Sequence, residues 1–452
     1  MIGRQEGFRR VLAHQILLAG LFTLLAFAYA IVFNASMSYM GNEDPAAAAF
    51  VLKNFWHAIL FTQFKIILVY LAGFALLGTV SALVLHAVWY LAGWRAAGPR
   101  YRVALFSLPL LLYLHWFGYS VLSWPAAYSR TLFEKGSLRR GLQVFLTDGP
   151  GPGYYTAMLV LALLAAALLG VLVVRKLVRE GRGAAFRRAG GRLRSRFRRP
   201  RLAVAVLVLL FAGLAVWAVV PAGAPQQAPQ RKNLLIIAAD ALRPDRLSLN
   251  GYTRRTTPNL DRYFSRATSF DNIHAEVPRT FPAWVTMLCS QYSLTHGIRH
   301  MFPRREERAR SFPSLLHVLR GAGYRTGVVS DFAGDIFPRI GLGFQRVQAP
   351  RFTFDDLLTQ GNLEIHTFLF PFLLNSAGRA LFPVVREFAQ RPDGGLLARE
   401  TIGMIRDFSR EGPFAVTLFL STTHFPYANR HPWYKKFTDP AYRGEYRYYK
   451  QQ

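Results

Sequence analysis

The chain has a single cysteine, Cys289, among its 452 residues. It therefore cannot form an intrachain disulfide, and a metal site built from several thiolates is excluded. Acidic residues are scarce as well: 25 Asp and Glu stand against 55 Lys and Arg, which gives a formal net charge of +30. No cleavable signal peptide is evident, because the apolar run that follows the basic residues 3–10 is too long and lacks a clear cleavage site. We expect this run to be an uncleaved first membrane helix.

Hydrophobic residues make up 52% of the chain and gather in long runs before about residue 221. A helix needs about 20 such residues to cross about 30 Å of hydrocarbon. Five segments meet this requirement and predict a five-helix transmembrane domain over residues 1–221. They are 11–33, 66–91, 103–124, 156–174 and 202–220. Lys65 stands at the start of the second segment, where its side chain can reach the membrane surface.

The basic residues predict the orientation of these helices. A basic excess often indicates nucleic-acid binding, but here it is concentrated in the connections 4–10, 95–102 and 175–201. With five spans these connections lie on one side, which the positive-inside rule identifies as the cytoplasm. We therefore expect no nucleic-acid partner, a cytoplasmic N-terminus and a multi-pass protein of the bacterial inner membrane.

The third connection departs from this charge pattern because it carries Arg130, Lys135, Arg139 and Arg140. Residues 130–146 are interpreted as an amphipathic helix on the outer membrane surface, where basic side chains meet lipid phosphates. An ordinary polar loop is the alternative interpretation.

After the fifth span, residues 222–232 have the composition of a linker, and residues 233–452 are expected to lie in the periplasm. Continuous apolar runs of strand length predict a mostly parallel sheet in an α/β domain. The expected strands are 233–239, 325–330 and 414–420, and the expected helices are 311–321 and 399–408. Asp240, Asp331 and His424 follow the ends of these strands, the edge where ligands bind in such sheets.

Residues 363–385 are also apolar, but Pro371, Asn375, Gly378 and Arg379 interrupt them. We expect a core helix or a lip resting on the membrane, and not a sixth span.

Two motifs make this half of the chain resemble the sulfatase and alkaline-phosphatase superfamily. A strand ends in Asp240, and TPNLD at 257–261 begins the next helix. The segment 278–289, PRTFPAWVTMLC, then aligns with the family's Cys/Ser-x-Pro-x-Arg pattern and places Thr280 at the nucleophile position. The resemblance covers about residues 231–452 and implies a sulfatase-like fold.

The chain departs from true sulfatases at three positions of these motifs. Thr280 cannot become formylglycine, Trp284 stands where the motif has Arg, and Ala241 replaces the second Asp after the first strand. A threonine nucleophile behind membrane helices resembles the phosphoethanolamine and phosphoglycerol transferases of bacterial envelopes. Those enzymes usually have Glu at the first ligand, so Asp240 leaves membrane-anchored hydrolases open.

The resemblance implies one divalent metal ion, zinc in the first place, with manganese, magnesium or calcium as alternatives. Asp240 and Thr280 would be its ligands, and the metal would activate the Thr280 hydroxyl for attack on phosphorus. His424 would protonate the departing group. Arg243 and Arg279 are candidates for binding phosphate or sulfate oxygens.

The resemblance implies transfer of a phospholipid headgroup to an envelope lipid or glycan, with membrane lipids as donor or acceptor. An ester hydrolase of the same superfamily is the first alternative. A non-catalytic lipid-binding or sensing protein is the second.

The Asp-His pair that completes the family's metal site does not occur in this sequence. We therefore expect the domain to be incomplete at its C-terminus, and the chain alone to bind metal weakly and to turn over little substrate.

Overall fold

The computed structural model describes the chain in ten segments. They are residues 2–34, 45–91, 99–133, 137–148, 153–158, 160–161, 231–270, 272–388, 391–439 and 441–442. Of the predicted fourth span only its start is among them, and the predicted fifth span and residues 222–230 lie outside the described residues. The five-span count and the predicted domain boundary therefore stay predictions.

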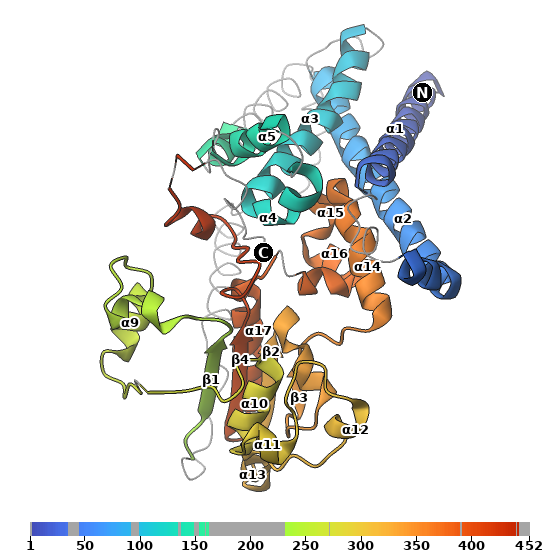
Figure 1. The fold of residues 1–452 in the computed structure, drawn as a ribbon. Helices are drawn as coiled ribbons and strands as arrows, with labels where there is room; N and C mark the ends of the chain where they lie inside the picture. The colour runs from blue at the N-terminus through green and yellow to red at the C-terminus, as the bar shows by residue number, and fades with distance from the viewer. Residues whose placement is uncertain are drawn as a thin grey trace, which may run out of the picture. The chain divides into compact units, whose positions relative to one another are not determined.

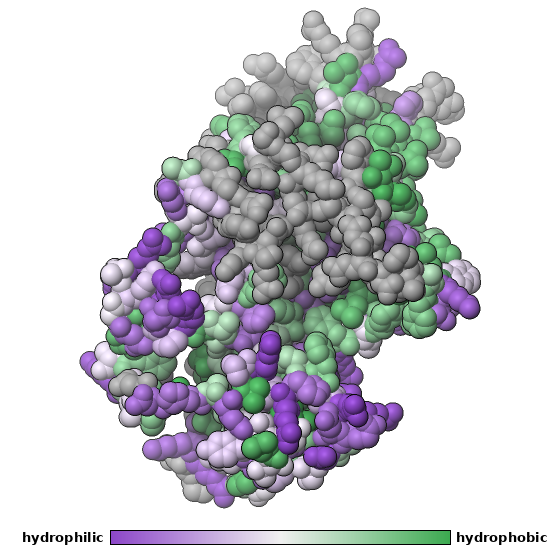
Figure 2. Space-filling view, in the orientation of Figure 1, coloured by the Kyte–Doolittle hydropathy of each residue, from purple (hydrophilic) through white to green (hydrophobic). Residues whose placement is uncertain are grey.

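Three helices of the described residues are long and apolar enough to cross a membrane. They are α1 (Ile2–Tyr29), α2 (Pro45–Leu91) and α3 (Pro99–Ser123). Their apolar windows are Ala13–Val32, Ala49–Val88 and Tyr101–Ser123, so the predicted first and third segments agree with helices of the structure. Figure 2 shows hydrophobic residues gathered over α1 and α2, among them the exposed Leu24, Leu60 and Leu68.

The predicted start of the second segment at residue 66 is wrong, because α2 begins at Pro45. Residues 45–65 contain no glycine and have their single proline in the first turn, where it favours helix initiation. Lys65 therefore lies inside a helix and not at its start. Its ammonium group is 4.6 Å from the ring centroid of Phe382, a cation–π contact.

The described chain divides into two compact units. One comprises residues 1–12, 77–111 and 150–230, and the other comprises 13–76, 112–149 and 231–452. The second unit thus combines parts of the apolar helices with the whole C-terminal half.

The C-terminal half contains a four-stranded parallel sheet in the order β1-β4-β2-β3 (Figure 1). The strands are β1 (Leu234–Ala239), β2 (Arg325–Ser330), β3 (Arg346–Gln348) and β4 (Phe414–Leu420). The predicted strands at 325–330 and 414–420 are confirmed, and the one at 233–239 is confirmed from its second residue. The short β3 was not predicted, since its three residues carry no period of their own.

Both faces of β4 are buried, which is why its sequence is apolar throughout. Phe414, Val416 and Leu418 point to one face and pack with α17 (Gly394–Phe408). Ala415 and Phe419 point to the other face, as the alternation of a strand requires. This two-sided cover makes the domain α/β, as predicted.

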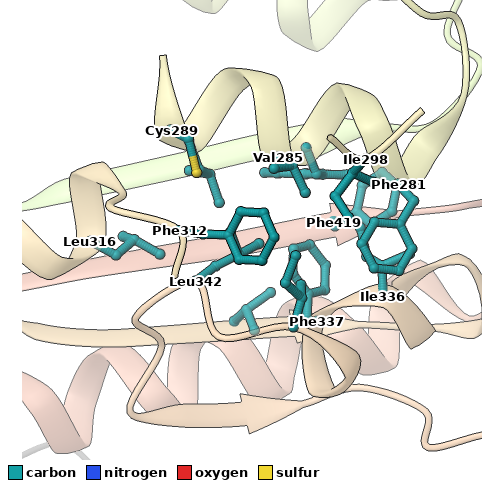
Figure 3. Close-up of a cluster of buried hydrophobic side chains, with 14 of the residues drawn as sticks. Phe281, Val285, Cys289, Ile298, Phe312, Leu316, Ile336, Phe337, Leu342 and Phe419 are labelled. Atoms are coloured by element: carbon teal, nitrogen blue, oxygen red, sulfur yellow. The ribbon is translucent and has the colours of Figure 1, made fainter. Parts of the chain in front are cut away.

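The larger core lies on the second face of the sheet and is drawn in Figure 3. Helices α10 (Thr280–Cys289) and α13 (Leu315–Gly321) contribute Phe281, Val285 and Leu316, all fully buried. Cys289 joins this cluster as a core thiol. The cluster fixes α10 against the sheet, and with it the residue that begins α10.

Short helices fill the remaining connections of the domain. They are α9 (Pro258–Phe264), α11 (Ser293–His296), α12 (Arg305–Arg308), α14 (Phe354–Ile365), α15 (Phe370–Leu373) and α16 (Ser376–Leu381). The predicted helix at 399–408 is the second half of α17, which begins at residue 394. The predicted helix at 311–321 begins later, because Ser314 caps α13.

Residues 353–388 form a segment that packs against the apolar helices and is called the docking segment here. It contains α14, α15, α16 and two 3₁₀ turns. Of the expected interruptions, Asn375 lies between α15 and α16 and caps α16, whereas Pro371 lies in the first turn of α15 and Gly378 and Arg379 lie inside α16. Gln63 of α2 donates to Asn362 Oδ1 at 2.8 Å, and Tyr113 of α3 donates to the Phe368 carbonyl at 2.5 Å. The segment is therefore not one core helix, and the predicted alternative of a lip resting on the membrane stays a prediction.

Helix α5 (Ser137–Asp148) occupies most of the predicted amphipathic segment 130–146. Gln143 anchors it by donating to the carbonyl oxygen of Pro125, 3.0 Å away, and to the Ser129 hydroxyl, 2.7 Å away. The helix prediction is confirmed, and the alternative of an ordinary polar loop is wrong. Its position at a membrane surface stays a prediction.

Candidate active site

The site begins at the carboxyl edge of the sheet. Asp240 directly follows β1, and its backbone N–H donates to the Leu420 carbonyl at the end of β4, 2.8 Å away. Since β1 and β4 are parallel and in register, the residues after β4 emerge beside Asp240. His424 lies in the turn there, and its N–H donates to the Ser421 carbonyl at 2.9 Å. Strand pairing thus brings together residues 184 positions apart.

Thr280 reaches the same place from α10. Its Oγ1 lies 3.4 Å from Asp240 Oδ2, at the long end of hydrogen-bond distances. Arg279 occupies the N-cap position, so Thr280 is the first helical residue and its hydroxyl does not cap the helix. No acidic residue stands in the first turn of α10. The positive end of the helix dipole is therefore not neutralised by a side chain of that turn.

Asp240 has an electrostatic setting that suits a proton acceptor. Burial raises the pKa of its carboxyl group above the ordinary value. The charge of nearby His424, the N–H of Ala241 and the Thr280 hydroxyl oppose this increase in the pKa. A carboxylate that is partly desolvated accepts a proton more readily than one in water.

The His424 ring has one nitrogen engaged locally. Nδ1 lies 2.8 Å from the carbonyl oxygen of Phe425, so Nδ1 carries the proton in this arrangement. Nε2 is then the nitrogen left for acid–base chemistry. The ring of Phe332 packs edge-on at 5.9 Å between centroids and orients the imidazole.

The two predicted phosphate-binding arginines are exposed, whereas Asp240 and Thr280 are partly buried. Arg243 forms an ion pair with Asp245, with 2.7 Å between its Nη2 and Oδ2, and both side chains are exposed. Arg279 is exposed at the N-cap of α10. Their predicted role in binding phosphate or sulfate stays a prediction.

Two residues shape the backbone at Asp240, a role that the sequence did not predict for either of them. Thr423 Oγ1 donates to the Asp240 carbonyl at 2.6 Å. Ala241 has φ of 56°, in the left-handed region that a residue with a Cβ seldom occupies. The hydroxyls of Thr422 and Thr423 beside His424 were a signal for the first of these, whereas no sequence pattern marks the second.

Asp331 follows β2 at the same edge but belongs to another network. Its carboxylate accepts a short hydrogen bond from the Ser421 hydroxyl and is buried. Burial raises the pKa of this carboxyl group, and the two hydrogen bonds from Ser421 oppose the increase. Asp331 therefore holds β2 to the turn after β4 and is not directed at Thr280.

The described residues do not contain a complete metal site. No group of three or more His, Cys, Asp or Glu side chains able to hold an ion occurs among them. Asp240 and Thr280 supply oxygen donors, but structural or catalytic metals need at least three protein ligands in most sites. These two residues therefore fit part of a metal site only.

Comparison with known proteins agrees with this fold. The family model described as Sulfatase matches residues 232–451. An N-acetylgalactosamine-6-O-sulfatase of Bacteroides thetaiotaomicron is 29% identical over 130 residues, which are 26% of this chain and 24% of that enzyme. The chain thus aligns with about a quarter of that relative's length. No solved structure matches.

Domains of this family are generally metal-dependent enzymes that act on esters. The parallel sheet agrees with the family match. Residues 232–451 of this chain are a domain of the sulfatase and alkaline-phosphatase superfamily.

Proposed function

We propose that this protein transfers a phosphoryl headgroup from a membrane phospholipid to an envelope lipid or glycan, with Thr280 as nucleophile. The observation that supports this most is the Thr280 hydroxyl, which begins α10 and lies 3.4 Å from the Asp240 carboxylate. A nucleophile beside a base is the arrangement that covalent catalysis requires.

In the first half-reaction Asp240 accepts the hydroxyl proton of Thr280 as Oγ1 bonds to phosphorus. The bond from phosphorus to the lipid oxygen breaks, and that oxygen takes a proton from His424. Diacylglycerol leaves, and the headgroup phosphate stays on Thr280. The acceptor hydroxyl then gives its proton to His424 and attacks phosphorus, and Thr280 recovers its proton from Asp240.

The choice of phosphorus over sulfur rests on the nucleophile. Thr280 cannot become the formylglycine that true sulfatases use, but its hydroxyl can carry a phosphoryl group. Three apolar helices in the same chain support a lipid substrate and an inner-membrane location, with the α/β domain in the periplasm. One divalent ion, zinc in the first place, is part of the proposal and needs ligands beyond Asp240 and Thr280.

A hydrolase is the second candidate. The similarity to an N-acetylgalactosamine-6-O-sulfatase favours it. In this case water replaces the acceptor hydroxyl in the second half-reaction, so the two candidates differ in their need for a second substrate.

The test compares Thr280→Ala with Thr280→Ser and with the control Thr295→Ala, which changes an exposed threonine of α11. The detergent-purified protein is assayed with excess Zn²⁺ or Mn²⁺, so that weak metal affinity does not conceal activity. The substrates are acyl-labelled phosphatidylethanolamine, with and without a lipid A acceptor, and an aryl sulfate. Labelled diacylglycerol and free sulfate are measured.

We expect Thr280→Ala to lower the rate of diacylglycerol release at least about 100-fold, since removal of a nucleophile leaves only residual catalysis. Thr280→Ser retains measurable activity, and the Thr295→Ala variant matches the wild type. Accurate-mass analysis of the Thr280 peptide identifies a phosphoethanolamine adduct. Aryl sulfate turnover without an acceptor supports the hydrolase instead, and full cellular function of Thr280→Ala means that the protein is not catalytic.

A further inference from the structure

Two arginines meet at one tryptophan just beyond the third apolar helix. Trp124 follows the apolar window Tyr101–Ser123 and is 6% exposed. The guanidinium carbon of Arg391 lies 4.9 Å from the Trp124 ring centroid, and that of Arg430 lies 5.6 Å from it. The site therefore holds two positive charges on one aromatic ring.

Arg391 is buried and forms no ion pair with any described residue. It is 4% exposed, and its Nε has no hydrogen-bond partner. Burial lowers the pKa of this guanidinium to about 10, and the charges of Arg379 and Arg430 add to the decrease, although Asp393 opposes it. The Asp393 Oδ1 accepts from the Leu396 N–H as the cap of α17, 3.0 Å away.

The nearby ion pair does not supply the missing anion. Asp148 of α5 is bonded to Lys435 Nζ at 2.6 Å. Among the described residues, no ion pair includes Arg391, Arg430 or Arg379. Cation–π contacts with Trp124 stabilise the two guanidinium groups by less than the desolvation of a buried cation costs. An external anion would restore this balance.

The location identifies the chemistry of that anion. Tryptophan at the end of an apolar helix is typical of the headgroup layer of a membrane. The turn at His431 is tied to the same helix end, because its N–H donates to the Ser123 carbonyl at 3.1 Å. Phosphate groups are the anions of that layer, and guanidinium forks bind phosphate in two-pronged fashion.

We propose that Arg391 and Arg430, stacked on Trp124, bind the phosphate of an anionic membrane phospholipid. The exposed Arg430 provides access from outside, and the buried Arg391 completes the phosphate contacts. This proposal does not depend on chemistry at Thr280. It adds a lipid-binding site that neither the family match nor the motifs predicted.

The experiment measures lipid retention. The full chain is purified in a mild detergent with added phosphatidylglycerol, and native mass spectrometry counts the lipids that stay bound. Arg391→Gln and Arg430→Gln are compared with the control Arg410→Gln, which removes one charge from an exposed position of the α/β domain. Phosphatidylcholine and soluble glycerol phosphate serve as alternative ligands in thermal-shift measurements.

We expect one retained phosphatidylglycerol per wild-type chain, about tenfold weaker retention in each variant, and no change in the control. If Arg391→Gln does not fold, phosphatidylglycerol retention by the exposed Arg430→Gln variant tests the proposal. Equal retention by the wild type and Arg430→Gln overturns the proposal, because the arginines then serve only to pack on Trp124. A thermal shift by glycerol phosphate as large as that by phosphatidylglycerol also overturns it, in favour of a site for free phosphate.

Discussion

Glu387 is the acidic side chain whose protonation departs most from its behaviour in water. It lies at the end of the docking segment, where Oε2 has no hydrogen-bond partner. Burial raises the pKa of Glu387 to about 8, and the charges of Asp331 and Glu400 add to the increase, while Arg386 opposes it. Arg386 is bonded to Glu400 Oε2 at 2.6 Å. Glu387 is therefore protonated in the folded protein at pH 7.

This shift predicts a stability that depends on pH. Between the unfolded pKa of 4.5 and the folded pKa of about 8, the folded chain holds a proton that the unfolded chain has lost. The free energy of unfolding consequently falls as pH rises through this window, by up to about 1.4 kcal/mol per pH unit. Glu387→Gln removes that dependence.

The measurement is the melting temperature of the detergent-solubilised protein at pH 5.5 and pH 8. We expect the wild type to lose more stability than Glu387→Gln between these values. Glu411→Gln, at an exposed position paired with Arg325, should behave as the wild type. Identical pH profiles for wild type and Glu387→Gln would contradict the assignment.

At the residue scale, the motifs predicted that Asp240 and Thr280 share one site, and the structure places their side-chain oxygens 3.4 Å apart. The roles predicted for them and for His424 stay predictions. Strand ends and a helix start have sequence signals, and a parallel sheet brings its strand ends to one edge. Arg243 donates to the carboxylate of Asp245, two residues away. A bound phosphate or sulfate would have to displace that carboxylate, and the sequence did not predict this ion pair. The burial of Arg391 was not predictable from the sequence either, because it depends on tertiary contacts.

At the scale of elements, the docking segment depends on one close approach. A Cβ added to Gly73 of α2 would lie 2.8 Å from the ring of Phe372. The same ring packs against Phe74, Tyr113 and Trp116, with centroids 5.2, 5.7 and 5.3 Å away. Glycine at residue 73 thus makes room for the side chain that anchors α15.

Changing either partner should loosen this contact. We expect Phe372→Ala to lower the stability of the second compact unit by about 2–4 kcal/mol through lost packing. Gly73→Leu should cost about 1–3 kcal/mol through overpacking. Thermal unfolding and protease cleavage within 353–388 measure both effects, with the exposed Phe270→Ala as the control. Unchanged cleavage in both variants would mean that the segment is held by other contacts.

Elements were predictable to different degrees. The strand 414–420 was predicted to the residue because FAVTLFL is a largely apolar run of strand length, buried on both faces. The strand 325–330, RTGVVS, was predicted as a short strand that ends just before Asp331. The start of α2 was missed because hydropathy marks the apolar window and not the end of the hydrogen-bonded helix. For the docking segment the sequence predicted only two alternatives, a core helix or a lip resting on the membrane. Its short helices are stabilised by contacts with other parts of the chain, which the sequence does not reveal.

At the scale of the whole molecule, metal binding tests how complete the site is. With oxygen donors from Asp240 and Thr280 alone, we expect less than one zinc per chain after dialysis against buffer without metal. Metal content is measured by mass spectrometry, and Asp240→Asn should lower it further. One tightly held zinc per chain would show that more ligands converge on Asp240 than the described residues include.

The contacts of the docking segment have a consequence for kinetics. Gln63 of α2 and Tyr113 of α3 hold residues 362 and 368 of the docking segment. Under the proposed function, an enzyme anchored to apolar helices meets its lipid substrates by lateral diffusion in two dimensions. Its rate then follows the mole fraction of substrate in the bilayer and not the bulk concentration. Diluting the substrate with inert lipid at constant total amount would slow it, as surface dilution slows interfacial enzymes.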